Sequence, residues 1–453
     1  MSHKIIKLSP LVLAAAAAGF SSQAFSSGFA LIEQGASGQG VAYAGAAAVG
    51  EDASTIFFNP AAMTRLSGQQ IVFAGHVVGV NFEYKDSGQS SLPGLPPGSL
   101  TGPNSDGGAT SFVPNFYWAA KLQNDLHVGV GVNVPYGLAT DYDDGWVGRY
   151  HGLKSEIMTI NINPAIAWKA TNTVSFGFGL SVQYIDIELT NNIWSPAVCG
   201  AFGASCNTAG DSGLKLTADD TSIGWNAGVL WDITQKDRIG VAYRSEVKHD
   251  VTGNADYSMD SDPTLQFVLT NVNAALDPFT VFTDAALTAA ASMPETFSVS
   301  YVRDINPNWS LLADWTWTGW DSLDTVDILI TGGAAGQDPT LDLAFKNTNR
   351  FSVGAHYKPG NKWIFRGGLA YDEAPVRSAE LRSVRVPDND RTWLSLGLGY
   401  EPSKSWSFDV GYSHLFVDDT DINNSSRASS GATLIGTYEA SVDILSAGVN
   451  FNF

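Results

Sequence analysis

The feature that most constrains the fold of this chain is an alternation of apolar and polar side chains with a period of two. In the stretch TVSFGFGLSVQY the apolar positions are Val174, Phe176, Phe178, Leu180, Val182 and Tyr184. A strand with this pattern has one face against an apolar medium and the other face against a polar space. The pattern predicts about 14 strands, at 69–85, 110–122, 126–140, 154–170, 173–190, 221–233, 237–254, 294–305, 308–320, 346–358, 362–374, 391–402, 405–418 and 439–453.

The connections between these strands are alternately short and long. The short ones are QND, ATNT, TQKD, NPN, PGN and PSK, and the longest cover roughly 86–109, 189–220, 255–293, 321–345 and 419–438. Short periplasmic turns and long outer loops are typical of an up-and-down barrel in a bacterial outer membrane. A soluble sandwich or propeller would explain the strands but not the alternation of loop lengths. We therefore expect an all-β fold, a transmembrane antiparallel β-barrel of about 14 strands.

The first residues predict a secretory signal peptide over residues 1–26. Lys4 and Lys7 precede the apolar run from Leu8 to Phe20, and Ala24-Phe25-Ser26 offers small residues to a signal peptidase. The run is too short to cross a bilayer as a helix. We place cleavage after Ser26, with cleavage after Ala24 as the alternative, and expect an exported protein of the Gram-negative outer membrane.

Charge and motifs argue against several functions. The formal net charge is −20, so the chain lacks the basic footprint of a nucleic-acid-binding protein. The motifs G-x-S-x-G and H-E-x-x-H are absent, and the histidines His76, His127, His151, His249, His356 and His414 are scattered. We expect no enzymatic activity, no cofactor, no metal site and no nucleic-acid partner.

Residues 27–67 precede the first strand, and residues 68–453 hold all the strands. The earlier segment is rich in Gly and Ala and carries only four charged residues, Glu33, Glu51, Asp52 and Arg65. A disordered tail would be more polar, and a barrel of this size has a lumen wide enough to be filled. We therefore expect a compact N-terminal hatch inside the barrel, with the Asn59-Pro60 turn at its floor.

Two cysteines, Cys199 and Cys206, lie in the expected loop 189–220. Their close spacing in an exported protein favours a small disulfide. A redox or metal-binding pair is the alternative, but no histidine lies near them in the sequence.

Several motifs in this chain resemble the FadL-like long-chain fatty acid transporters of Gram-negative outer membranes. They include SGQGVAYAGAAAVGEDAST, NPAAMTRL, YGLATDY, FRGGLAYDEAPV and VPDNDRTWLSLGLGY, and the resemblance extends over essentially the whole mature chain. It implies a 14-stranded barrel closed by an N-terminal hatch. On this chain the hatch residues would be Phe29, near a buried ligand pocket, and Asn59, Pro60 and Ala61.

The resemblance also implies a kink in the third strand that opens a lateral gap, at Tyr136, Gly137 and Leu138. Pro135 supports a break there independently, because proline cannot donate to the strand ladder. The implied mechanism is passive. An outer groove captures a hydrophobic ligand, a pocket above the hatch binds it, and the gap releases it sideways into the membrane. Candidate groove residues are Leu265, Phe267, Val268, Leu269, Phe279, Val281 and Phe282. The alternative for each of them is packing on the loop's own core.

The expected ligand is a long-chain fatty acid. The alternatives are an aromatic or other hydrophobic hydrocarbon and, further, the solutes of a general porin. Basic residues that could meet a carboxylate are candidates by composition only, namely Arg377, Arg382, Arg385, Arg391 and Lys346. Asp388 and Asp390 are expected to brace their loop by pairing with Arg391. We further expect a monomer whose other partners are outer-membrane lipid and lipopolysaccharide. The acid pairs Asp143-Asp144 and Asp418-Asp419 lie in loops, where we expect them to be solvated, or bridged by divalent ions to lipopolysaccharide, rather than catalytic.

Overall fold

The structure is a computed structural model that describes residues 28–123, 125–203, 205, 211–276, 281–332, 339–425 and 431–453. The expected signal peptide, residues 1–26, lies outside the described residues. So do Phe279 of the expected groove and Cys206 of the expected disulfide.

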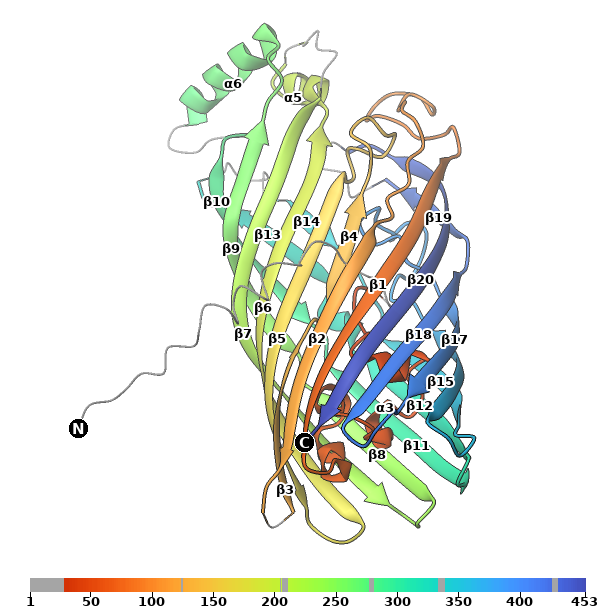
Figure 1. The fold of residues 1–453 in the computed structure, drawn as a ribbon. Coiled ribbons are helices and arrows are strands. Elements are labelled where there is room, and N and C mark those ends of the chain that lie inside the picture. The colour runs from red at the N-terminus through yellow and green to blue at the C-terminus, as the bar shows by residue number, and fades with distance from the viewer. Residues whose placement is uncertain are drawn as a thin grey trace, which may run out of the picture.

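Within the described residues, fourteen antiparallel strands close into a barrel, as predicted, and β1 pairs with β20 to complete it (Figure 1). Six of the fourteen are interrupted, so that twenty segments are distinguished. They are β1 (Gln69–Asp86), β2 (Thr110–Lys121), β3 (Leu126–Asn133), β4 (Gly137–Asp141), β5 (Lys154–Lys169), β6 (Val174–Ile193), β7 (Ser212–Asp232), β8 (Asp237–Arg244), β9 (Val247–Ser258), β10 (Ala285–Met293), β11 (Thr296–Asn306), β12 (Trp309–Thr318), β13 (Thr325–Ile330), β14 (Thr340–Asp342), β15 (Thr348–Tyr357), β16 (Trp363–Asp372), β17 (Arg391–Tyr400), β18 (Trp406–Val417), β19 (Thr420–Asn424) and β20 (Leu434–Asn452).

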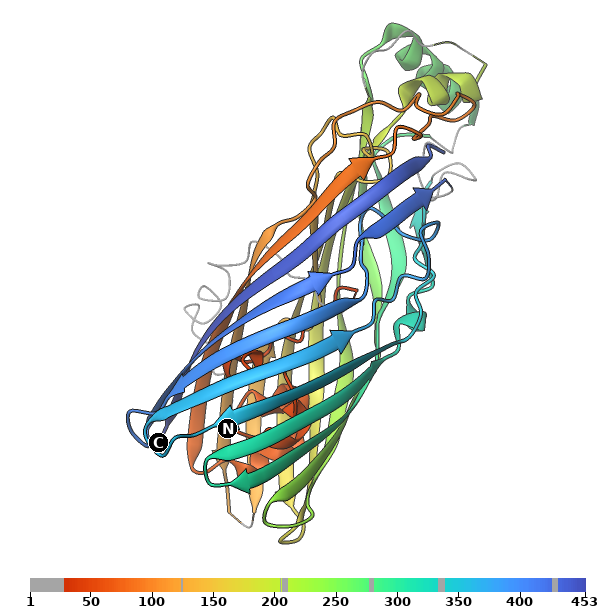
Figure 2. The ribbon, with the colours of Figure 1, turned by 90° about the vertical axis from the view of Figure 1, so that its right-hand side faces the viewer.

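The lower half of the barrel carries the apolar outer surface that the alternation predicts. Phe176, Phe178 and Trp225 are exposed on the outside, where lipid would cover them. Near the short turns at the lower end (Figure 2), aromatic rings pair across neighbouring strands, as in Trp363 with Tyr400, whose ring centroids lie 4.4 Å apart. Such rings form the girdle expected at a membrane interface. No helix in the described part of the chain is long and apolar enough to cross a membrane.

The predicted bounds of four long loops are wrong because the strands continue further than the apolar pattern. β13 and β14 lie within the expected 321–345 loop, and β19 and the start of β20 lie within the expected 419–438 loop. β6 and β7 stay paired up to Ile193 and Ser212, which shortens the expected 189–220 loop. β9 and β10 likewise pair up to Ala255 and Ala285. In these outer parts the exposed face is polar, so the backbone pairing persists while the period-two apolar signal disappears.

Residues 28–66 lie inside the lower lumen (Figure 1). They form α2 (Ala36–Gln39), α3 (Ala46–Val49), α4 (Thr55–Phe58) and the 3₁₀ helix η1 (Pro60–Arg65). Glycines of the wall let this segment approach closely. A Cβ at Gly228 would lie 2.0 Å from Asn59 Oδ1, and one at Gly177 would lie 2.1 Å from the Ala61 nitrogen. The Asn59 side chain accepts a bond from the Ala61 nitrogen and donates to the carbonyls of Ala47 and Val229.

The lumen carries more charge than the sequence pattern indicated. Arg366 on β16 pairs with Asp409 at 2.6 Å and with Glu51 of the N-terminal segment at 3.1 Å. Arg244 donates to the Phe57 carbonyl, and Arg350 donates to the Ala42 carbonyl. These wall charges therefore hold the N-terminal segment in the lumen.

Candidate ligand site in the barrel lumen

An apolar cavity of about 90 Å³ lies in the lumen above the N-terminal segment. Its wall comes from strands on several sides of the barrel, and Phe29 contributes from the N-terminal segment. The lining residues are Phe29, Leu138, Ile157, Ile187, Leu189, Leu216, Thr217, Ala218, Val251, Leu287, Ala289, Ala291, Met293, Leu323, Val326, Ile328, Leu341, Leu343, Arg385 and Val386. Such a site can bind an apolar molecule, because transfer of apolar surface out of water is favourable.

Phe29 is held at the base of this cavity by backbone pairing with the third strand. The Leu31 nitrogen donates to the Pro135 carbonyl at 2.8 Å, and the Gly137 nitrogen donates to the Phe29 carbonyl at 2.9 Å. The Gly28 nitrogen also donates to Asp388 Oδ2 at 2.7 Å. The N-terminal segment therefore acts as a short extra strand that fixes the Phe29 ring.

The third strand is interrupted at the residues that the sequence indicated, between the end of β3 and the start of β4. β2 pairs with β3 only from Phe116 to Lys121, and β4 pairs with β5. Pro135 lies in the interruption and cannot donate to the ladder. In the described part of the chain, the outer half of β2 therefore has no strand partner on this side.

A layer of aromatic rings separates the apolar cavity from a second cavity below it, whose lining has both apolar and polar residues. Trp320 makes edge-to-face contacts with Phe29 at 4.9 Å, Tyr136 at 6.4 Å and Phe345 at 5.7 Å between ring centroids. The lower cavity, of about 110 Å³, is lined by several hydroxyl side chains and by Arg244, Asp314, Arg350 and Asp372. Tyr136 lines this lower cavity, and its hydroxyl donates to the Pro294 carbonyl at 2.7 Å.

Arg385 is the charged residue that lines the apolar cavity. Its guanidinium donates to the carbonyls of Lys154 and Thr190, at 3.0 and 3.1 Å, and to Ser155 Oγ at 2.9 Å. Burial lowers the pKa of Arg385 to about 10. Within the described residues no carboxylate forms an ion pair with it, so it is a buried cation bonded to neutral acceptors.

The other basic candidates do not line this cavity. Arg377 donates to the carbonyls of Ala344 and Phe345. Arg382 donates to the carbonyls of Asp388 and Asp421. The backbone nitrogen of Lys346 donates to the Pro375 carbonyl.

The predicted pairing of Asp388 with Arg391 is confirmed. Asp390 has other partners, since it accepts bonds from the Tyr371 hydroxyl at 2.6 Å and from the Ala374 nitrogen at 2.8 Å.

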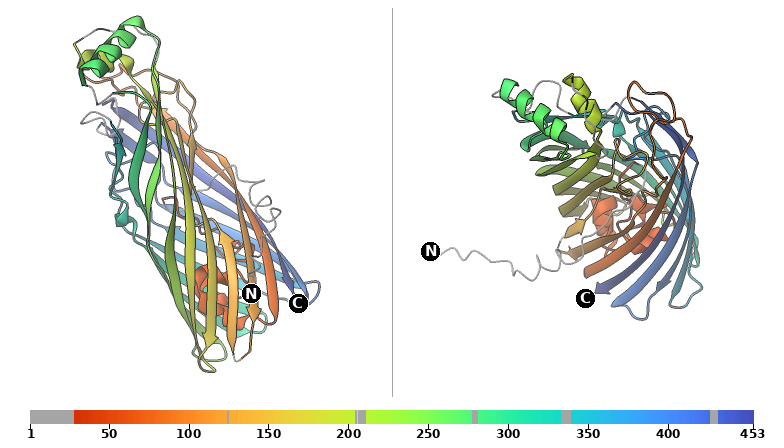
Figure 3. Two further views of the ribbon diagram at one scale, coloured as in Figure 1. Left: turned by 90° about the vertical axis from the view of Figure 1, so that its left-hand side faces the viewer. Right: turned by 90° about the horizontal axis from the view of Figure 1, so that it is seen from above.

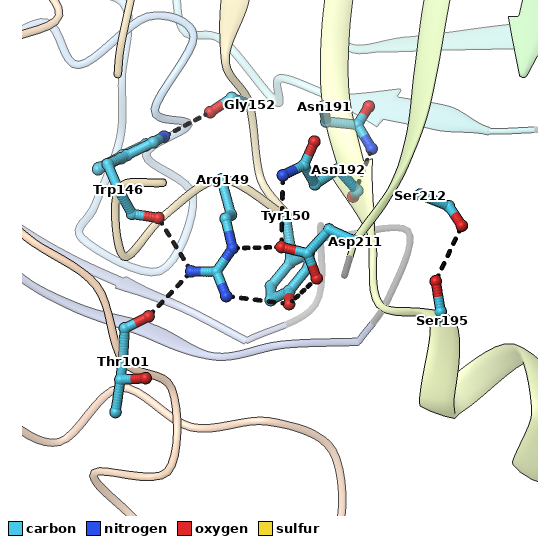
Figure 4. Close-up of polar contacts among 10 residues, drawn as sticks. All are labelled: Thr101, Trp146, Arg149, Tyr150, Gly152, Asn191, Asn192, Ser195, Asp211 and Ser212. Carbon is cyan, nitrogen blue, oxygen red and sulfur yellow. Dashed lines mark hydrogen bonds and ion pairs between the residues drawn. The ribbon is translucent and has the colours of Figure 1, made fainter. Parts of the chain in front are cut away.

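The loop after β4 is fastened to its neighbours by polar contacts (Figure 4). Arg149 Nε donates to Asp211 Oδ2 at 2.6 Å, and Arg149 Nη1 donates to the Thr101 carbonyl at 2.9 Å. The Tyr150 hydroxyl donates to the other oxygen of Asp211 at 2.5 Å. These bonds join three outer segments to one another.

The expected groove lies at the outer rim, where α5 (Ser195–Ala201) packs against α6 (Pro263–Leu276) (Figure 3). α6 was predicted as loop. Asp262 caps its start, because its carboxylate accepts bonds from the nitrogens of Thr264 and Leu265.

One face of α6 is buried and the other is exposed. Leu265, Val268 and Leu269 are buried, whereas Phe267 is 70% exposed. In the segment after the helix, Val281 is buried and Phe282 is half-buried. Of these groove candidates, Phe267 is the one whose ring faces outward. Cys199 is buried in α5, and its expected partner, Cys206, is not described.

Sequence reasoning missed Trp320, which is fully buried at the centre of the aromatic layer. The only signal in the sequence was indirect. Trp315 and Trp317 continue an alternation of outward-facing apolar residues, which ends at Gly319. Because Trp320 follows the end of this alternation, the pattern does not predict whether its side chain points outward or into the barrel.

Comparison with known proteins agrees with this architecture. Residues 17–453 match the family described as outer membrane protein transport protein (OMPP1/FadL/TodX). The long-chain fatty acid transport protein of Escherichia coli O6:H1 is 32% identical over 92% of each chain. Outer membrane protein P1 of Haemophilus influenzae (strain Rd) is 29% identical over 94% of this chain and 95% of its own.

Two solved structures have the same fold. A Pseudomonas aeruginosa FadL homologue superposes with a TM-score of 0.83 at 24% identity, covering 94% of this chain and 100% of that one. The Pseudomonas putida toluene transporter TodX superposes with a TM-score of 0.67 at 15% identity, with the same coverage.

A closed fourteen-stranded barrel with an apolar outer belt and a filled lumen defines this chain as a transport protein of the Gram-negative outer membrane. More particularly, the chain belongs to the FadL/TodX family of outer-membrane transporters for hydrophobic compounds.

Proposed function

We propose that this protein takes up long-chain fatty acids passively across the outer membrane. The observation that carries the proposal is the apolar cavity with the buried Arg385 on its lining. An apolar chain would occupy the cavity, and its carboxylate would give Arg385 the negative partner that it lacks among the described residues. Charge-assisted bonds of this kind are stronger than the neutral ones that Arg385 makes here.

The route begins at the outer rim and ends in the membrane. The exposed ring of Phe267 on α6 offers an apolar surface where a ligand is captured. The ligand then binds in the cavity above the hatch, residues 27–67. It leaves through the interruption at Pro135, Tyr136, Gly137 and Leu138, whose neighbour β5 presents apolar residues outward.

The cavity must widen during transport of a long chain. Its volume of about 90 Å³ is smaller than the engineered cavity of about 150 Å³ that admits benzene in another protein. The aromatic layer and the N-terminal segment below it are the parts that would move to widen the cavity. The protein is expected to act as a monomer among lipid and lipopolysaccharide.

The small cavity favours a second candidate ligand, a monoaromatic hydrocarbon. Such a molecule needs less widening and no contact with Arg385. The toluene transporter TodX has the same fold, which is compatible with this alternative.

Uptake of labelled oleate and labelled toluene by cells that lack their own transporter and express this chain tests the proposal. Oleate uptake without accelerated toluene uptake supports the fatty acid assignment. Accelerated toluene uptake without oleate uptake assigns the protein to hydrocarbons. Free passage of small sugars with neither would mean that the lumen is an open pore.

A further inference from the structure

Another of the wall's interruptions lies between β10–β11 and β12–β13, and is called the second interruption here. It is larger than the short bulges of ordinary strands. Thr288 pairs with Leu329, and Thr296 pairs with Thr318. From Thr288 to Thr296, on the β10–β11 side, the chain advances eight residues. From Thr318 to Leu329, on the β12–β13 side, it advances eleven. The last ladder pair above the gap is Ala289 with Ile328, so β10 below it has no partner on this side within the described residues.

The three extra residues turn inward and close the interruption with side chains. They form part of the 3₁₀ helix η2 (Trp320–Ser322) and the residues that follow it. Trp320 and Leu323 are buried, whereas Asp321 and Asp324 are exposed. A β-bulge normally adds one residue to one strand, so this departure is larger and brings a whole indole ring into the lumen.

The apolar cavity lies directly behind this interruption. Ala291 and Met293 line it from the β10 side, and Leu323 and Val326 line it from the other side. An apolar ligand in the cavity would therefore be separated from the outside here by side chains alone, with no strand ladder between them.

The two interruptions lie at different heights relative to the apolar belt. Beside β10, strand β9 presents the exposed residues Lys248, Asp250 and Thr252, so this part of the wall is above the hydrocarbon zone. Beside the kinked third strand, Gly137 pairs with Met158, and the exposed Ile162 follows further down β5. The third-strand gap therefore faces lipid, and the second interruption faces the polar zone outside it.

The two interruptions are also tied to each other across the lumen. The Tyr136 hydroxyl, from the third-strand kink, donates to the carbonyl of Pro294 at the base of the second interruption. Phe29 contacts both Tyr136 and Trp320. Displacement of Phe29 by a ligand would therefore loosen both places at once.

We propose that the interruption between β10 and η2–β13 is a second portal, through which an apolar ligand passes from the outer surface into the cavity, with Leu323 among the side chains that close it. This rests on the proposed uptake of hydrophobic ligands through the cavity. The outer portal admits the ligand, and the third-strand gap, which faces lipid, releases it.

A reversible cross-link tests the portal. Ser292 and Thr325 would be opposite one another if the β10–β13 register continued, so the double variant Ser292→Cys/Thr325→Cys closes the interruption when oxidised. The matched control is Thr288→Cys/Leu329→Cys, which joins two residues that are already paired. Both variants keep Cys199 and Cys206, so the oxidant and the reductant act on the native cysteines equally. Uptake of oleate and toluene is measured in the oxidised and reduced forms, after a gel assay for the folded barrel.

We expect the oxidised Ser292→Cys/Thr325→Cys protein to lose at least about fivefold in uptake rate and to recover on reduction, as a blocked gate would, while the control is unchanged. Equal uptake in the cross-linked and reduced forms would overturn the portal and leave the proposed function standing. If both reduced proteins are folded but take up neither ligand, the proposed function itself fails.

A second variant covers the case in which the cross-link does not form. Ser292→Cys alone is labelled with a bulky maleimide, with labelled Thr288→Cys as the control. Loss of uptake only on labelling at position 292 supports the portal, and undiminished uptake contradicts it.

Discussion

The rings of Phe29 and Trp320 meet edge to face with centroids 4.9 Å apart, which joins the N-terminal segment to an interruption in the barrel wall. The contact is tight on both sides, since a Cβ at Gly28 would lie 2.7 Å from the Trp320 ring. Gly28 has φ +66°, a conformation that glycine adopts without strain. The start of the hatch is thus packed against the wall at a place where the wall has no ladder to hold it.

Phe29→Ala should loosen this start without unfolding the barrel. A buried Phe→Ala change costs about 3–5 kcal/mol, enough to raise the exchange rate of local amides by roughly 100-fold or more. The amides to follow are those of Leu31 and Gly137, which bond across the contact with the third strand. Phe416→Ala, at an outward-facing ring that is 54% exposed, is the control. Unchanged exchange at both amides would mean that Phe29 does not anchor the segment.

Gly228→Ala should displace the floor of the hatch. The added methyl group would lie 2.0 Å from Asn59 Oδ1, so Asn59 would have to give up its bonds to Val229 and Ala61. We expect a higher ion conductance of the purified barrel in planar bilayers. Gly367→Ala is the matched control, because its Cβ would meet nothing within 4 Å. Equal conductance of the two variants would count against a seal at this point.

The sites around Phe29 and Asn59 show which parts of the structure could be predicted from the sequence. Strand number and order could be predicted because lipid selects apolar residues at every second outward position, as at Phe176 and Phe178. Asn59 and Phe29 could be placed through motifs shared with a family. The interruption at Pro135 had its own physical signal, since proline breaks a ladder.

The rest had no local signal. Strand residues such as Asp219 and Asp220, which lie above the apolar belt, do not alternate in hydrophobicity although they are paired with β6. Trp320 is buried by contacts with Phe29 and Phe345, which lie far from it in sequence. Arg385 could be named only as one of several arginines, because its position at the cavity depends on how its loop folds inward.

The stability of the hatch should depend on pH, because the carboxyl group of Glu33 is buried in it. Burial raises its pKa to about 7 from 4.5, against the opposing effect of the Arg350 and Arg391 charges. The folded state therefore favours the protonated carboxyl. Its contribution to stability is complete below pH 4.5 and is lost as the pH rises through 7, by up to about 3 kcal/mol. Wild-type melting temperature should fall between pH 5 and 8 more steeply than that of Glu33→Gln, whose side chain stays neutral.

The control for this measurement is Glu439→Gln, which removes a half-exposed carboxylate paired with Lys85. Its melting curve should follow the wild type at every pH. If Glu33→Gln also follows the wild type, Glu33 is ionised in the folded protein throughout this range.

Replacement of Pro135-Tyr136-Gly137 by Val-Thr-Val should leave a folded barrel that no longer transports. The new residues can pair with the outer half of β2 on the side where β3 does not reach it, and that pairing would close the gap. The measurement is uptake of oleate and toluene alongside a gel assay for the folded barrel. Tyr136→Phe is the control, since it removes the bond to Pro294 but keeps the interruption. Normal uptake by the Val-Thr-Val variant would rule out lateral release at this place.

Arg385→Met should separate the two candidate ligands. Methionine keeps much of the apolar stem that lines the cavity but removes the positive charge, so a carboxylate would lose its partner while a neutral hydrocarbon would lose nothing. We expect oleate uptake to fall about tenfold, which corresponds to about 1.4 kcal/mol of lost interaction, and toluene uptake to stay the same. Arg377→Met is the control, because Arg377 bonds the carbonyls of Ala344 and Phe345 and does not line the cavity. An equal loss for both ligands would show that Arg385 only supports the loop, through its bonds to Lys154 and Thr190.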